Sequence, residues 1–194
     1  MTAHHTESIP SSTEIALESR ARAGDRAAAS ALLARHRERL VHFCRRYVGS
    51  EVAAEDAAQD VLTKMLALEA WPQGSLRAWL YRVARNHCLN SVRDGRHARA
   101  MVDGLARASE LLSPRTGPRT AAVRLEDSDR LWQAIASLSK EHAEVLFLRY
   151  FDELSRDEIA SVLDVDASIV KSRLARARQE LADRIERQQR DTSS

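Results

Sequence analysis

The chain has 194 residues and a formal net charge of +2 at pH 7, with only six glycines and four prolines. This length accommodates one mid-sized domain or two small ones, and the absence of alternating apolar and polar stretches argues against a strand-rich fold. The two cysteines, Cys44 and Cys88, are too few and too far apart for a disulfide framework or a metal cluster, and they favour a reducing compartment. Because the sequence lacks strand-like alternation and has few glycines and prolines, we expect an all-α protein.

The N-terminal residues do not have the pattern of a signal peptide, and no segment of the sequence predicts a membrane span. Residues 1–11 are rich in His, Thr and Ser without an apolar core, which predicts a disordered tail and no signal peptide. No run approaches the ~18 apolar residues that a bilayer span requires. A second tail is expected at 188–194, and the protein is expected in the cytoplasm.

Apolar residues at helical spacing predict four helices in a first domain over residues 12–99. The first helix follows a capping-box spacing that begins with Ser11, and it ends at Gly24, which tolerates a left-handed backbone. Asp25 is placed to cap the second helix. The further helices are predicted at about 26–48, 52–69 and 76–97, with breaks at Gly49-Ser50 and at a turn-rich connector over 71–75.

Residues 100–127 change in character, since they contain two glycines, two prolines and no sustained apolar periodicity. They are predicted to form a flexible linker of roughly 30 Å reach. We therefore expect the two domains to hold no fixed relative orientation in the free protein. A second domain over 128–187 is predicted to contain helices at about 128–137, 139–151, 155–163 and 167–187.

The last two predicted helices have the pattern of a helix-turn-helix unit, which makes the second domain a helix-turn-helix four-helix domain. Ser155 and Glu158 form a second capping box, and Asp166 is a suitable N-cap for the last helix. Asp164 lies in the turn, where the residue must tolerate a positive φ. Val170 supplies the aliphatic anchor of the second helix.

The last helix separates an apolar stripe from a polar and basic face. The stripe consists of Val170, Leu174, Ala177 and Leu181. The opposite face and its flanks carry Ser168, Lys171, Ser172, Arg173, Arg176, Arg178 and Gln179. A helix in the major groove has this layout, with central side chains at base edges and flanking cations at phosphates. An ordinary amphipathic helix with a solvated basic face is the alternative.

The predicted helix 76–97 is rich in arginine. Its inward positions are Leu76, Trp79, Leu80 and Val83, with His87 also expected on the inward side as a partly buried residue. Its outward positions include Arg82, Arg85 and Arg93, a row suited to a phosphate backbone. Tyr81 and Trp71 are candidates for stacking on bases, with packing in the core as the alternative.

The predicted helix 52–69 carries an acidic face, formed by Asp56, Gln59, Asp60 and Thr63 opposite Val61 and Met65. Carboxylates beside an arginine-rich helix would repel DNA and instead favour a protein partner. A solvated helix face is the alternative. The sequence contains no glycine-rich phosphate loop, nucleophile elbow or acid–base pair, so we expect no enzymatic activity, no cofactor, no metal and no small-molecule substrate.

Four stretches, in this order, resemble sigma factors of the extracytoplasmic-function (ECF) group within the sigma-70 family. They are residues 21–25 (ARAGD), 55–61 (EDAAQDV), 79–86 (WLYRVARN) and 170–178 (VKSRLARAR). The resemblance covers both predicted domains, about 150 residues, and excludes the tail and the linker. It implies a factor that binds core RNA polymerase and directs promoter recognition and transcription initiation.

The resemblance also implies a role for each domain. The first domain is expected to bind the clamp helices of the polymerase β′ subunit through Asp56, Gln59, Asp60, Thr63 and Lys64. It is expected to read the −10 promoter element through Trp71, Gln73, Arg77, Arg82, Arg85, Asn86 and Arg93. The second domain is expected to dock on the β flap and to read the −35 element through Ser168, Lys171, Ser172, Arg173, Arg176 and Gln179. An anti-sigma factor is a further candidate partner.

Two other functions remain open at this point. A helix-turn-helix regulator would bind operator DNA without joining the polymerase, so copurification with core polymerase separates it from a sigma factor. A helical adaptor that binds only proteins would show no salt-sensitive binding to DNA.

Overall fold

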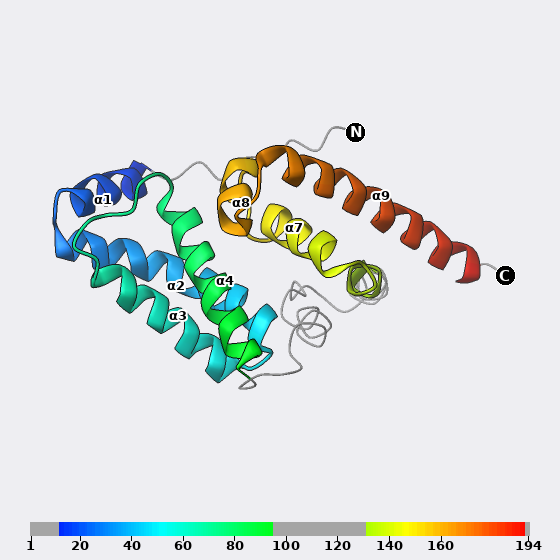
Figure 1. The fold of residues 1–194 in the computed structure, drawn as a ribbon, viewed down its shortest axis with the longest axis horizontal. Helices are drawn as coiled ribbons and strands as arrows, with labels where there is room; N and C mark the ends of the chain where they lie inside the picture. The colour runs from blue at the N-terminus through cyan, green and yellow to red at the C-terminus, as the bar shows by residue number, and fades with distance from the viewer. Residues whose placement is uncertain (1–11, 95–130, 193–194) are drawn as a thin grey trace, which may run out of the picture.

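The computed structural model describes residues 12–94 and 131–192, and within these ranges every regular element is a helix (Figure 1). The first domain contains α1 (Ser12–Arg22), α2 (Arg26–Val48), α3 (Glu51–Leu66) and α4 (Leu76–Arg93). The second domain contains a helical segment at 131–136, followed by α7 (Lys140–Tyr150), α8 (Arg156–Leu163) and α9 (Ala167–Thr192). The prediction of two small helical domains is confirmed. None of the described helices is long and apolar enough to cross a membrane.

The first domain is held together by α2, α3 and α4, which lie side by side with α1 against one end of α2 (Figure 1). Side-chain caps define where these helices begin: Asp25 accepts from the Ala28 N–H at 3.0 Å, and Ser75 accepts from the Ala78 N–H at 3.2 Å. Gly49 ends α2 in a left-handed conformation with φ 68°. The core contains Leu40, Phe43, Val61, Leu80 and Tyr81, each at most 1% exposed.

Tyr81 corrects one sequence-based expectation. It was a candidate for stacking on bases, but its side chain is 1% exposed and packs edge-on against Phe43, with ring centroids 4.8 Å apart. Trp79 and Val83, expected to face inward, are only half-buried. The buried face of α4 is therefore rotated toward Tyr81, Ala84 and Cys88.

The second domain packs α7 and α8 against the N-terminal half of α9. Its core includes Trp132, which stacks on Phe147 with ring centroids 5.9 Å apart. Two helix ends differ from prediction: α3 ends at Leu66 rather than near 69, and α9 continues to Thr192 through the predicted tail. The extension of α9 follows from its Arg, Gln and Glu residues, which are good helix formers with no intervening Gly or Pro.

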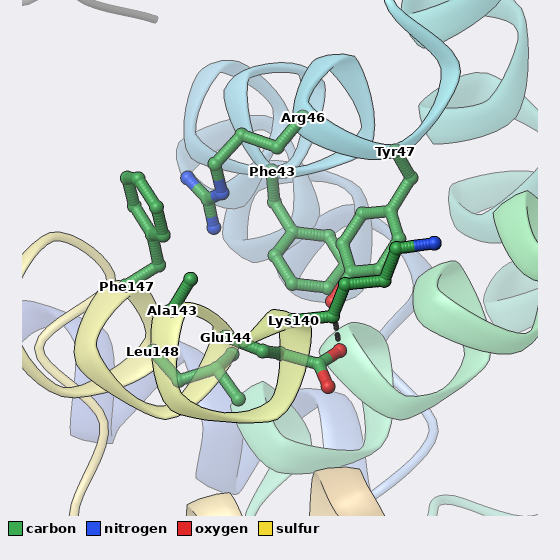
Figure 2. A pocket seen from close by; sticks show the side chains of 8 residues that line it. All are labelled: Phe43, Arg46, Tyr47, Lys140, Ala143, Glu144, Phe147 and Leu148. Carbon is green, nitrogen blue, oxygen red and sulfur yellow. Dashed lines mark hydrogen bonds between the residues drawn. The ribbon is translucent and has the colours of Figure 1, made fainter. Parts of the chain in front are cut away.

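The two domains pack against each other. The N-terminal part of α4 lies along α8, and α7 faces α2 and α4 (Figure 1). In this structure side chains from both domains form ion pairs and ring contacts across the interface between them, which we call the seam (Figure 2). That the free domains hold no fixed relative orientation stays a prediction. The predicted linker at 100–127 lies outside the described residues, as does the predicted cap Ser11.

Candidate nucleic-acid interface

The polar face of α9 is directed to solvent. Its buried stripe consists of Val170, Leu174 and Ala177, which are at most 3% exposed. The residues expected at DNA that are fully on the surface are Ser168, Lys171, Ser172, Arg176 and Gln179. Arg173 is half-buried, with Nη2 3.3 Å from a carboxylate oxygen of Glu141 on α7. The polar side chains of α9 therefore face solvent and its apolar stripe faces the core, as predicted for a helix that enters the major groove.

The turn between α8 and α9 sets the orientation of α9 relative to α8. Asp164 ends α8 with φ 56°, the left-handed conformation that the sequence predicted at this position. Ser155 and Glu158 form the predicted capping box at the start of α8. At the start of α9, the Asp166 carboxylate accepts from the Ser168 N–H at 2.7 Å. At the α8 end of the turn the Asp164 backbone N–H donates to the Ala160 carbonyl, and at the α9 end the Asp166 side chain accepts from Ser168, so hydrogen bonds hold both ends of the turn.

Two arginines of α4, Arg77 and Arg85, bind groups of the second domain. Arg85 donates from Nε and Nη2 to the two carboxylate oxygens of Glu144, at 2.7 and 3.2 Å. Arg77 donates to the backbone carbonyl of Asp152. Arg82 is half-buried, whereas Asn86 and Arg93 are exposed. Of the three arginines predicted on the outward side of α4, Arg85 is therefore bound by the second domain.

The loop between α3 and α4 borders a hollow that is large enough for a small ligand. Trp71 and Gln73 line it together with residues of the α1–α2 turn and of the C-terminal end of α3, and its volume is about 590 Å³. Arg22 of α1 holds the loop in place, because its guanidinium donates to the carbonyls of Pro72 and Gly74 at 3.0 and 2.8 Å. In the described part of the chain, the indole N–H of Trp71 is buried without a hydrogen-bond partner.

The sequence analysis assigned no role to Arg22, although this residue lies in the stretch 21–25 (ARAGD) that resembles the sigma factors. It also missed two apolar residues on α3. Val52 and Leu66 are 69% and 47% exposed, and they continue the face of Asp56, Gln59 and Thr63 at spacings of three and four residues.

We call Val52, Asp56, Gln59, Thr63 and Leu66 the α3 stripe. Asp60 and Lys64, beside it, are exposed as well, and the Asp60 carboxylate lies 3.7 Å from His87 Nε2. The spacing was visible in the sequence, since residues at intervals of three and four share one side of a helix.

The two cysteines lie in the core of the first domain. Cys44 on α2 and Cys88 on α4 are fully buried. A hydrogen bond with Cys88 and burial both raise the pKa of the Cys44 thiol, so the nucleophilic thiolate is disfavoured. In the part of the chain that the structure describes, no three His, Cys, Asp or Glu side chains are grouped to hold a metal ion.

Two family models match the chain, one for each domain. Residues 32–98 match sigma-70 region 2, and residues 128–181 match sigma-70 region 4. The first match covers α2 to α4, and the second covers the helix-turn-helix unit and the helices before it.

Similar proteins span nearly the whole chain. The chain is 33% identical to the RNA polymerase sigma factor NccH of Alcaligenes xylosoxydans over 178 residues, which are 88% of this chain and 93% of the relative. It is 28% identical to the ECF RNA polymerase sigma factor SigW of Bacillus subtilis, over 81% of this chain and 89% of the relative.

Among solved structures, the fold is similar to that of the sigma factor RpoE in complex with the anti-sigma factor NepR from Bartonella quintana. The TM-score is 0.53 at 22% identity, over 77% of this chain and 91% of that chain. The helix-turn-helix, the arrangement of α2 to α4, both family models and these relatives agree, and the chain belongs to the ECF group of the sigma-70 family of RNA polymerase sigma factors.

Proposed function

We propose that this sigma factor binds core RNA polymerase through the α3 stripe, reads the −10 element with the α3–α4 loop and α4, and reads the −35 element with α9. The single observation that carries the proposal is the exposed polar face of α9 on a helix-turn-helix whose turn is fixed at both ends. Sigma factors direct transcription initiation, so the chain acts by binding rather than by catalysis, in the cytoplasm where the polymerase works.

For the −35 element, the central positions Ser172 and Arg176 would lie at base edges. Arg176 is suited to a bidentate contact with the O6 and N7 atoms of a guanine. Lys171 lies at the edge of the exposed face and would contact phosphate, which contributes affinity without sequence preference. The exposure of all three side chains supports this assignment.

For the −10 element, the hollow beside Trp71 and Gln73 has a volume of about 590 Å³, within the range of small-ligand sites. A single base turned out of the stack would fit such a hollow, and Trp71 contributes an aromatic side chain to its lining. The loop is braced by Arg22, so the hollow is already formed in the free protein.

For the polymerase, the α3 stripe combines carboxylate, amide and hydroxyl groups with two exposed apolar side chains. A helix with this face fits against another helix, as the resemblance to sigma region 2 implies for the β′ clamp helices. We further propose that an anti-sigma factor and the β flap are partners, in line with the NepR-bound relative for the first and with the family for the second.

Run-off transcription with purified chain, core polymerase and a genomic fragment library tests the proposal. We expect discrete transcripts that depend on the added chain, and their upstream sequences should share two elements. Binding to specific DNA without any transcript would instead identify an operator-binding regulator. The matched control is the double variant Ser172→Ala/Arg176→Ala, which keeps the fold and the α3 stripe and should lose most of the transcripts.

A further inference from the structure

The proposed function assigns no role to the first helix, α1. The match to sigma-70 region 2 begins at residue 32, within α2, whereas α1 ends at Arg22. The loop between α3 and α4 nevertheless passes along α1 and is hydrogen-bonded to it (Figure 1). α1 is therefore placed to influence the loop that is proposed to read the −10 element.

Polar and apolar contacts fix α1 against α2. Near its start, Glu14 Oε1 lies 3.4 Å from His36 Nε2. Near its end, the Arg20 guanidinium donates to the carboxylate of Asp25, the N-cap of α2, at 2.6 and 2.9 Å. A small apolar cluster joins α1, the start of α2 and the α3–α4 loop, and it consists of Leu17, Ala21, Ala28, Ala29 and Trp71. The position of α1 is thus defined relative to both α2 and the loop.

Arg22 is the polar link between α1 and the loop. Its Nη1 donates to the Pro72 carbonyl at 3.0 Å, and its Nη2 donates to the Gly74 carbonyl at 2.8 Å. Nε and Nη2 also donate to one carboxylate oxygen of Glu18, at 3.2 and 2.7 Å. Glu18 lies four residues earlier on α1, so it holds the planar guanidinium in the orientation that reaches both carbonyls.

The two carbonyls belong to the residues on either side of Gln73. Pro72 is buried, whereas Gln73 is exposed. Gly74 has φ 76°, a left-handed conformation that favours glycine. One guanidinium therefore fixes the backbone both before and after Gln73, in a segment that belongs to no helix.

A loop that is held in one conformation binds its ligand with a smaller loss of conformational freedom than a mobile loop. It also discriminates better between ligands, because a loop that can shift adapts to several of them. Trp71 and Gln73 are the two loop residues expected at −10 DNA, and each is next in sequence to a carbonyl that Arg22 binds. The hydrogen bonds of Arg22 thus act where the loop would meet a base.

We propose that Glu18 and Arg22 are positioning residues for promoter recognition: they hold the α3–α4 loop in one conformation and thereby set how strictly the protein distinguishes the bases of the −10 element. Both residues act through the loop and not by touching DNA. The proposal rests on the proposed function for the identity of the loop's ligand. It extends the −10-reading unit to α1, outside the segment that matches region 2.

Discrimination between promoters by the full chain with core polymerase tests this role. Run-off transcription is measured on one promoter from the fragment library and on derivatives in which each −10 base is replaced in turn. The ratio of transcript from the promoter to transcript from a derivative reports discrimination. Arg22→Ala should lower this ratio about tenfold at the position that the loop reads, because charge-assisted hydrogen bonds that hold the loop are lost. Discrimination at the −35 element should be unchanged.

Two conservative variants grade the effect, and a third variant is the matched control. Arg22→Lys should restore part of the discrimination, because an ammonium group can bind one carbonyl but lacks the fork that spans two. Glu18→Gln should lower discrimination less than Arg22→Ala does, because the guanidinium and both loop carbonyls remain. Arg20→Ala removes an arginine of α1 whose guanidinium binds Asp25, and it should keep the ratios of the parent.

Fluorine NMR of the free protein labelled with 5-fluorotryptophan monitors the loop itself. The chain has three tryptophans, and the Trp71 resonance is identified by its loss in Trp71→Phe. Arg22→Ala should shift or broaden this resonance, whereas Arg20→Ala should leave it in place. Affinity for core polymerase should be equal in all of these variants, which also verifies that they are folded.

A folded Arg22→Ala variant that kept the −10 ratios of the parent would overturn the proposal. An equal loss of discrimination in Arg20→Ala would overturn it as well, because the effect would then come from the docking of α1 and not from the loop carbonyls. If the parent chain supports no transcription, the proposed function fails and the role in promoter recognition fails with it. The fluorine spectra would still report whether Arg22 holds the loop.

Discussion

Arg176 and Lys171 lie on the same exposed helix face but are expected to contribute differently to DNA binding. Arg176 is in the centre of the face, opposite the buried Val170 and Leu174, whereas Lys171 is at its edge. Arg176→Ala should weaken binding to the −35 element by about 1–3 kcal/mol and relax its sequence preference. Lys171→Ala should weaken binding to all sequences alike and lower the dependence on salt.

Competition binding with a promoter duplex and a scrambled duplex measures both effects. The promoter duplex is taken from the run-off library. If Arg176→Ala kept the full preference for the promoter, the facing of α9 toward DNA would differ from the one proposed.

His36 makes the stability of the first domain depend on pH. It is 8% exposed, and burial lowers the pKa of its imidazole below the ordinary 6.5, although Glu14 lies 3.4 Å away and acts in the opposite direction. The unfolded chain therefore binds the proton more readily than the folded one. The contribution of His36 to stability is complete above pH 6.5 and is lost as the pH falls from 6.5 through the lowered pKa.

Urea unfolding at about pH 7.5 and pH 5.5 checks this, with His36→Gln compared with the parent. The variant should lose less stability on acidification than the parent does. His42→Gln is the control, because the His42 side chain is 47% exposed. An equal loss in parent and His36→Gln would show that other groups carry the pH dependence.

At the scale of single elements, α3 allows polymerase binding to be separated from DNA binding. The double variant Asp56→Ala/Asp60→Ala removes two exposed carboxylates and leaves the buried side of the helix intact. We expect affinity for core polymerase to fall about tenfold or more, because charged groups at an interface contribute to steering and register. Binding of −35 DNA by α9 should be unchanged.

Competition for core polymerase against a labelled sigma factor measures this effect. Glu38→Ala on α2 serves as the control, since its side chain is 90% exposed and distant from the α3 stripe in sequence. If the double variant competed for core polymerase as well as the parent does, the acidic face of α3 would be an ordinary solvated helix face.

The elements themselves could largely be predicted from the sequence, because the signals that define them are local. Asp25, Ser155, Glu158 and Asp166 each act within three residues of their own position, and Asp164 needs only a tolerance of positive φ. Tyr81 could not be assigned in the same way. Periodicity places it at the border of the buried face, and only packing against Phe43 decides that it is inside.

At the scale of the whole molecule, the seam should couple the unfolding of the two domains. Asp152 is 5% exposed and pairs with Arg46, so Asp152→Ala leaves a largely buried cation without its carboxylate. Loss of one partner from a buried pair costs about 3–5 kcal/mol. We expect calorimetry to show a single transition for the parent and two separate transitions for Asp152→Ala.

Asp157→Ala is the matched control, because Asp157 is exposed in the first turn of α8. It should keep the single transition with little change in its midpoint. Two transitions in the parent itself would mean that the seam does not couple the domains.

The seam could not be predicted from the sequence, for a physical reason. Glu144 and Arg85 are 59 residues apart, and each reads as an ordinary charged position on an amphipathic helix. Nothing local distinguishes an arginine that faces water from one that faces a carboxylate of another domain. The sequence therefore predicts that the arginines of α4 bind anions. It does not determine whether the anion is a DNA phosphate or a carboxylate of the second domain.

The ion pair between Arg85 and Glu144 has a consequence for how DNA binding responds to ionic strength. Binding of cationic side chains to DNA normally weakens steeply as salt is added, because the release of counterions contributes less. Salt screens a largely buried pair much less than exposed charges, and the Arg85 and Glu144 side chains are only 23% and 9% exposed. The two interactions of Arg85 therefore differ in their response to salt. Added salt should shift the competition for Arg85 away from DNA phosphate and toward the Glu144 carboxylate.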